Sequence, residues 1–151
     1  MSHRVFVYGS LLPSLPNHDF YLSTSTLLGS TTTATADYLL VDSRNGFPYA
    51  LDNVQESAVK LVGMLYEVSD ETLARLDMLE GHPNFYRRKK IALADGSDAI
   101  AYLLHDESTR KSIALDTDRY KRVEDGDWKR YWKREYSGDP TDEDAEVTPF
   151  S

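Results

Sequence analysis

The sequence predicts a single domain of the α+β class. Strands come first, one clear helix follows, further strands come next and a second helix closes the order, so strands and helices do not alternate regularly. The chain has 151 residues, which is enough to bury one sizeable core. We expect this domain to span 1–136 and the acidic tail, 137–151, to be disordered because it has little to bury.

The first strand, 4–8, carries apolar side chains on both faces, which is typical of a central strand covered above and below. Gly9 and Ser10 end it in a polar turn. Main-chain N–H groups gathered at such a turn can bind a carboxylate or an oxyanion. The alternative is a tight turn with no role beyond structure.

The middle of the chain is expected to hold a short helix and three extended segments. Asn17 can cap a helix over 17–22, and a bent strand is expected over 31–41. The segment 46–51 contains a proline, so it is expected at an edge or lining a surface. A further strand over 60–68 contains Gly63, which marks the close approach of main chain or ligand.

The second half begins with the clearest helix, 70–80, which Ser69 can cap and Gly81 can stop. A hairpin of 86–93 and 99–104 follows, turning at Asp95-Gly96. The polar stretch after it, 105–127, receives no assignment. Asp127 can cap a last helix, whose apolar stripe comprises Trp128, Tyr131, Trp132 and Tyr136.

Glu80 is the candidate catalytic residue. On a wheel of about 100° per residue it falls near 340°, between Leu73 at 0° and Leu76 near 300°, in the apolar stripe of its helix. Lost hydration and the negative helix C-terminus both raise the pKa of such a carboxyl group, which suits it to general acid–base chemistry. Alternatively, Glu80 caps the helix at the surface or pairs with Arg87 or Arg88.

The composition narrows the class of function. The absence of cysteine excludes disulfides, thiolate metal sites and a cysteine nucleophile, and the four histidines show no metal-ligand spacing. A net charge of −8 argues against nucleic acid or anionic membranes as the main partner. No apolar run reaches the roughly 18 residues of a membrane span, and no signal peptide is expected. These features favour a cytoplasmic protein.

Four stretches together resemble the γ-glutamyl cyclotransferase-like family, and most of all its γ-glutamylamine cyclotransferase subgroup. They are VFVYGSLL with Asn17-His18 after it, LVGMLYEV, LDMLEGHPNFYRR and IAYLL. The resemblance extends from residue 4 to about residue 104, and the GDW at 126–128 also suits the family. It implies a small, mixed, β-barrel-like sheet with helices packed outside.

The resemblance also implies a reaction in which the substrate's own α-amine attacks its γ-glutamyl carbonyl. The products are 5-oxoproline and a free amine or amino acid, and neither a cofactor, a metal nor an enzyme nucleophile is needed. Glu80 would be the proton shuttle. The γ-glutamyl group would be bound by backbone N–H groups of Tyr8, Gly9, Ser10 and Leu11. Tyr86 and Tyr120 would close the pocket as aromatic walls, Tyr120 on a loose match to a pocket-lining aromatic residue of the family. The alternative for both tyrosines is a place in the core.

Three functions remain open from the sequence. The first is a cyclotransferase acting on a small γ-glutamyl amine or γ-glutamyl amino acid. The second is a non-catalytic module that keeps a pocket for a small carboxylate or amide, and the third is a scaffold that uses the last helix and the acidic tail. A monomer is expected, with a dimer as the alternative.

Overall fold

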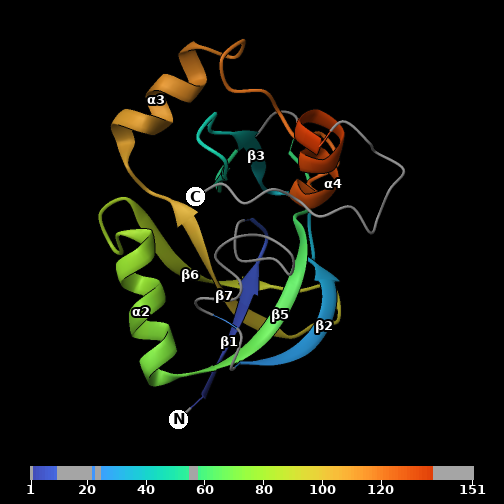
Figure 1. Ribbon diagram of the computed structural model, residues 1–151, viewed down its shortest axis with the longest axis vertical. Helices are drawn as coiled ribbons and strands as arrows, with labels where there is room; N and C mark the ends of the chain where they lie inside the picture. Colours follow the sequence, from blue (N-terminus) through green and yellow to red (C-terminus); the bar gives the residue numbers. More distant parts are fainter. Residues whose placement is uncertain (1, 10–21, 23–24, 55–57, 138–151) are drawn as a thin grey trace.

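The computed structural model describes residues 2–9, 22, 25–54 and 58–137. Its main feature is a five-stranded mixed sheet in the order β2-β5-β1-β7-β6, with helix α2 along one side (Figure 1). Only the β1–β7 pair is parallel among these strands. The strands are β1 (Ser2–Val7), β2 (Thr26–Thr32), β5 (Val62–Ser69), β6 (Tyr86–Ala92) and β7 (Asp98–Leu104).

The two outer strands of this sheet meet at one end. Thr33, just after β2, forms a bridge with Leu93, just after β6. The Ala34 N–H donates to the Ala92 carbonyl at 2.9 Å, and the Ala94 N–H donates to the Thr32 carbonyl at 3.0 Å. This contact joins the sheet edges and gives the expected barrel-like form, which also protects edge groups from pairing with other chains.

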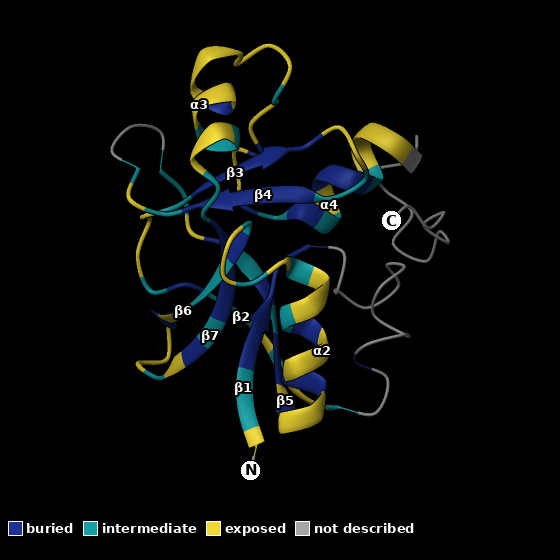
Figure 2. Ribbon diagram, turned by 90° about the vertical axis from the view of Figure 1, so that its left-hand side faces the viewer, coloured by how far each residue is buried: buried dark blue, intermediate teal, exposed yellow. Residues whose placement is uncertain are grey.

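Strand β1 is central, as predicted, and its residues Val5, Phe6 and Val7 are buried (Figure 2). Gly63 lies on the neighbouring strand β5, where a Cβ atom would stand 2.1 Å from the Val7 carbonyl oxygen. The close approach predicted at Gly63 is therefore an approach of the β1 main chain.

Helix α2 (Asp70–Glu80) has the predicted bounds. The Ser69 hydroxyl accepts a hydrogen bond from the Thr72 N–H at 3.1 Å, which caps the first turn. Gly81 ends the helix with a φ of 64°, a left-handed conformation that glycine adopts without strain. Both ends of the helix that carries Glu80 are thus fixed by local sequence.

The single bent strand predicted over 31–41 is wrong. Strand β2 ends at Thr32, and a separate strand, β3 (Leu39–Asp42), pairs with β4 (Pro48–Leu51) in a two-stranded sheet. Between them the Thr33 hydroxyl donates to the Thr35 carbonyl at 3.2 Å, and the Thr35 hydroxyl donates to the Asp37 carboxylate. These local hydrogen bonds turn the chain and interrupt the strand.

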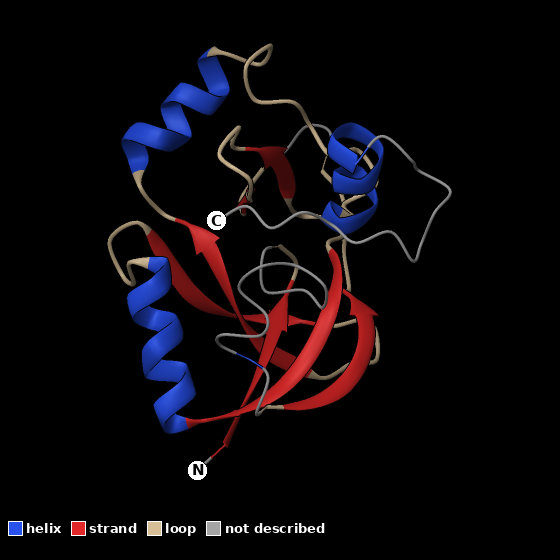
Figure 3. Ribbon diagram, viewed as in Figure 1, coloured by secondary structure: helices blue, strands red, loops and turns tan. Residues whose placement is uncertain are grey.

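The hairpin was predicted correctly, and the unassigned stretch after it contains a helix, α3 (Glu107–Leu115). The last helix begins at Trp128 with Asp127 as its cap, as predicted. At Lys133 it changes from α4 (Trp128–Trp132) to the π-helical η1 (Lys133–Ser137). Figure 3 shows the helices and strands by colour. Within the described ranges, no helix is both long and apolar enough to cross a membrane.

Two predicted features lie outside the described residues. They are the helix over 17–22, of which Leu22 alone is described, and the tail beyond residue 137.

Candidate active site

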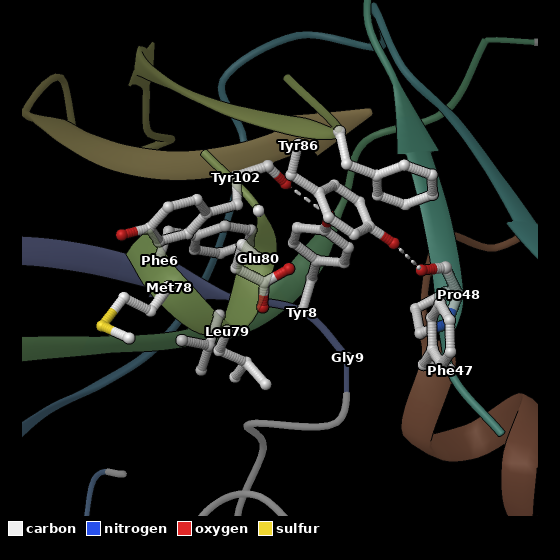
Figure 4. A pocket seen from close by; sticks show the side chains of 13 residues that line it. Phe6, Tyr8, Gly9, Phe47, Pro48, Met78, Leu79, Glu80, Tyr86 and Tyr102 are labelled. Carbon is white, nitrogen blue, oxygen red and sulfur yellow. Dashed lines mark hydrogen bonds between the residues drawn. The ribbon is translucent and has the colours of Figure 1, made fainter. Parts of the chain in front are cut away.

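A cavity of about 400 Å³ lies where the C-terminal turn of α2 meets the ends of β1, β6 and β4 (Figure 4). Its walls are mostly aromatic and aliphatic, and Glu80 is the one acidic side chain among the described lining residues. The lining comprises Phe6, Val7, Tyr8, Gly9, Phe47, Pro48, Met78, Leu79, Glu80, Gly81, Phe85, Tyr86 and Tyr102.

Glu80 occupies the position that the helical wheel predicts, half-buried against this cavity (Figure 4). Burial raises the pKa of its carboxyl group to about 7. Arg88, one of the two arginines considered as a partner, forms an ion pair with Asp77 instead, at 3.0 Å. A carboxyl group with this pKa can both take up and release a proton near neutral pH.

Tyr8 and Gly9, which follow β1, also line the cavity, and Tyr8 lies beside Glu80 (Figure 4). The Tyr8 hydroxyl donates a hydrogen bond to the Tyr102 carbonyl oxygen. A Cβ atom at Gly9 would lie 2.9 Å from the Pro48 ring, so a larger residue would crowd this wall. Ser10 and Leu11 lie outside the described residues, and their part in binding the γ-glutamyl group stays a prediction.

Tyr86 reaches across the cavity from β6 to β4, where its hydroxyl donates to the Pro48 carbonyl oxygen at 3.1 Å. Burial, helped by the nearby charge of Glu80, raises the pKa of both Tyr8 and Tyr86. Both phenols therefore stay neutral, with their protons donated to main-chain carbonyls. The remaining lone pairs of the two oxygens can accept hydrogen bonds from a bound N–H group.

Tyr120 does not belong to the cavity lining. Its ring packs against Tyr49, with the ring centroids 6.3 Å apart. The predicted site residues Glu80, Tyr8, Gly9 and Tyr86 thus line one cavity, whereas Tyr120 is not among its described lining residues.

Several lining residues were not singled out from the sequence. Phe6 could have been found, because it shares a strand face with Tyr8. Tyr102 could not, because its place depends on the register in which it pairs with Arg88 across β6 and β7. Phe47 and Phe85 come from segments that only tertiary structure brings together.

The model of a protein family described as "Gamma-glutamyl cyclotransferase, AIG2-like" matches residues 5–130 of the chain. The chain belongs to this family. That membership supports enzymatic activity of the γ-glutamyl cyclotransferase type in general. It agrees with the resemblance seen in the sequence motifs.

Individual relatives are consistent with this assignment. A protein of Methanocaldococcus jannaschii named "Putative gamma-glutamylcyclotransferase" is 38% identical over 129 residues, covering 84% of this chain and 96% of the relative. The "Gamma-glutamylaminecyclotransferase C" of Danio rerio is 32% identical over 61% of this chain and 62% of its own length. The crystal structure of an uncharacterized protein from Pyrococcus horikoshii has the same fold, with a TM-score of 0.63, 24% identity, and coverage of 89% and 97%.

Proposed function

We propose that this family member releases 5-oxoproline from a γ-glutamyl amine or γ-glutamyl amino acid, with Glu80 as the general acid–base. The observation that carries the proposal is the half-buried Glu80 carboxyl group, whose pKa is raised to about 7, on the wall of a cavity that Tyr8 and Gly9 also line. This arrangement supplies a proton shuttle beside a surface for the substrate.

In the proposed reaction the α-amine of the substrate forms a bond to the γ-carbonyl carbon. The ionised Glu80 first takes a proton from the α-ammonium, which frees the lone pair for attack. The tetrahedral intermediate then collapses as the bond from carbon to the leaving nitrogen breaks and Glu80 gives its proton to that nitrogen. The ring nitrogen still carries one proton too many, which the again ionised Glu80 takes up and passes to the released amine, so that the products are the neutral lactam and an ammonium group. Nucleophile and electrophile belong to one molecule, so the enzyme acts by positioning, charge stabilisation and proton transfer.

The tyrosines of the wall support this scheme. The hydroxyl oxygens of Tyr8 and Tyr86 have lone pairs free to accept from an ammonium or amide N–H, because their own protons are donated to the Tyr102 and Pro48 carbonyls. We also propose that main-chain N–H groups of the turn predicted at Gly9 and Ser10 bind the α-carboxylate or the developing oxyanion.

The test is release of 5-oxoproline by the purified protein, followed by mass spectrometry. The panel comprises ε-(γ-glutamyl)-lysine, several γ-glutamyl amino acids and glutathione. We expect stoichiometric 5-oxoproline and free leaving amine from at least one of them. Thermal stabilisation by these compounds without product would contradict catalysis and favour a non-catalytic binding module.

A further inference from the structure

A polar cluster lies beside Glu80, where α2 meets β6 and β7. Its centre is Asp77, which comes one helical turn before Glu80. The Tyr102 hydroxyl donates to Asp77 Oδ1 at 2.6 Å, and Arg88 Nη1 donates to Asp77 Oδ2 at 3.0 Å and to Oδ1 at 3.3 Å. One carboxylate therefore ties helix α2 to both β6 and β7.

Arg88 also holds the chain on the other side of Glu80. Its main-chain N–H donates to His82 Nδ1 at 3.2 Å, and the His82 N–H donates to the Asp77 carbonyl at 3.0 Å. Asp77 and His82 thus bracket Glu80 in the sequence, and both are bound to the same residue of β6. The turn that carries Glu80 is fixed at both ends.

The ion pair between Asp77 and Arg88 is partly shielded from solvent. The side chains of Asp77 and Arg88 are 24% and 35% exposed, so their ion pair is less screened than one at the open surface. Tyr102 joins the cluster to the cavity, since it lines the wall and its carbonyl oxygen holds the Tyr8 hydroxyl.

We propose that Asp77 is a positioning residue, which with Arg88 and Tyr102 holds the last turn of α2 so that the Glu80 carboxylate stays against the cavity. Asp77 is not among the lining residues, so it acts through Glu80 and not on the substrate. The expected effect of Asp77 on turnover rests on the proposed function, whereas its expected effect on the pKa of Glu80 does not.

The titratable groups around Glu80 come from each neighbouring element. They are Tyr8 just after β1, Tyr86 on β6 and Tyr102 on β7, with Asp77, His82 and Arg88 in the cluster. Strand β5 contributes no residue to the described cavity wall. The tyrosines stay neutral near pH 7, because burial raises the pKa of all three. If the turn loosens, water reaches the Glu80 carboxylate and its pKa falls toward the ordinary value.

The decisive variant is Asp77→Asn, which keeps the size of the side chain and an oxygen for Tyr102 but abolishes the ion pair with Arg88. Its matched control is Asp52→Asn, because Asp52 is also a partly buried, ion-paired carboxylate, with Lys89 at 2.6 Å and Arg110 at 3.3 Å, but lies outside this cavity. The readout is the titration midpoint of the Glu80 carboxyl carbon by ¹³C NMR, assigned by its loss in Glu80→Gln.

We expect a midpoint near 7 in the wild type and in Asp52→Asn, and a midpoint lower by about one unit or more in Asp77→Asn, as hydration returns. Arg88→Lys retains both charges of the ion pair but replaces the planar guanidinium group with a single ammonium group. A smaller fall of the Glu80 midpoint in this variant would therefore result from the lost geometry of the contact and not from a lost charge. Unchanged midpoints in Asp77→Asn and Arg88→Lys would overturn the proposal, even if both variants melt at a lower temperature.

Turnover provides a second readout. In Asp77→Asn, kcat is expected to fall about tenfold or more, with KM changed far less, because misplacement of a catalytic group affects the chemical step. The NMR titration needs no turnover. A wild-type protein that releases no 5-oxoproline would therefore refute the proposed function while the titration still decides the role of Asp77.

Discussion

At the scale of a single residue, the burial of Glu80 opposes the negative charge that the residue needs to accept a proton. Its carboxyl group is charged in the form that accepts a proton, yet burial against the cavity disfavours that charge and raises the pKa to about 7. A site that is useful for proton transfer near neutral pH therefore costs folding stability whenever Glu80 is ionised.

This conflict predicts a pH dependence of stability. The pKa of Glu80 is raised from 4.5 in the unfolded chain to about 7 in the folded protein, so the folded state binds more protons between these values. The contribution of Glu80 to the free energy of unfolding should fall as pH rises from about 4.5 to 7, by about 3 kcal/mol in total. Glu80→Gln removes this term.

Urea unfolding at pH 5 and pH 8 measures the effect. We expect Glu80→Gln to be more stable than the wild type by roughly 2–3 kcal/mol at pH 8, relative to their difference at pH 5. A difference between the two proteins that does not change with pH would contradict the raised pKa.

The sequence indicates Glu80 because helical periodicity alone places it among Leu73 and Leu76. It does not indicate Asp77, which the wheel places only at the flank of the stripe and whose partners are on β6 and β7. Tyr120 was expected in the pocket from a loose match, but its ring packs on Tyr49. A local sequence pattern cannot identify residues whose roles depend on strand register or on long-range contacts.

At the scale of elements, β5 sets the spacing on which the site depends. It pairs with β1, which ends at the cavity, and it leads directly into α2, which carries Glu80. Gly63 allows β1 to approach, because no side chain stands between it and the Val7 carbonyl.

Gly63→Ala is therefore expected to be strongly destabilising. The new Cβ would lie 2.1 Å from the Val7 oxygen, a main-chain atom that cannot move without shifting β1. We expect a loss of about 3 kcal/mol or more in the free energy of unfolding, measured with urea.

Ser30→Ala, at an exposed position of the neighbouring strand β2, serves as the control and should change stability by about 0.5 kcal/mol or less. A Gly63→Ala protein within about 1 kcal/mol of the wild type would show that β1 adjusts easily, contrary to the role assigned to this glycine.

Elements with strong local signals were predictable and those without them were not. Helix α2 has a capping serine, acidic residues in its first turn and a terminating glycine. Helix α3 buries Ile113 alone among its residues, so its apolar pattern is weak, although Asp106 capping the Thr109 N–H was a usable signal. The turn between β2 and β3 depends on side-chain hydrogen bonds of Thr33 and Thr35, which periodicity does not reveal.

At the scale of the whole molecule, the cavity lies between three parts of the structure: helix α2, the closed sheet and the β3–β4 pair. Lining residues in or next to β1, β6 and β7 come from the closed sheet, whereas Phe47 and Pro48 come from the separate β3–β4 pair. The buried Asp42 of β3 accepts hydrogen bonds from the Tyr131 hydroxyl at 2.8 Å and from the Tyr136 hydroxyl, which ties the last helix to the β3–β4 pair. The C-terminal helix therefore supports one wall of the site from a distance.

In the proposed reaction, Glu80 transfers the proton during release of 5-oxoproline. The most direct test compares kcat of the wild type, Glu80→Gln and Glu71→Gln on the best substrate of the γ-glutamyl panel. Glu71 is exposed in the first turn of the same helix, so Glu71→Gln makes the same chemical change away from the cavity. We predict a loss of about 10²–10⁴-fold for Glu80→Gln and near wild-type turnover for Glu71→Gln. Turnover by Glu80→Gln within about tenfold of the wild type would contradict the claim.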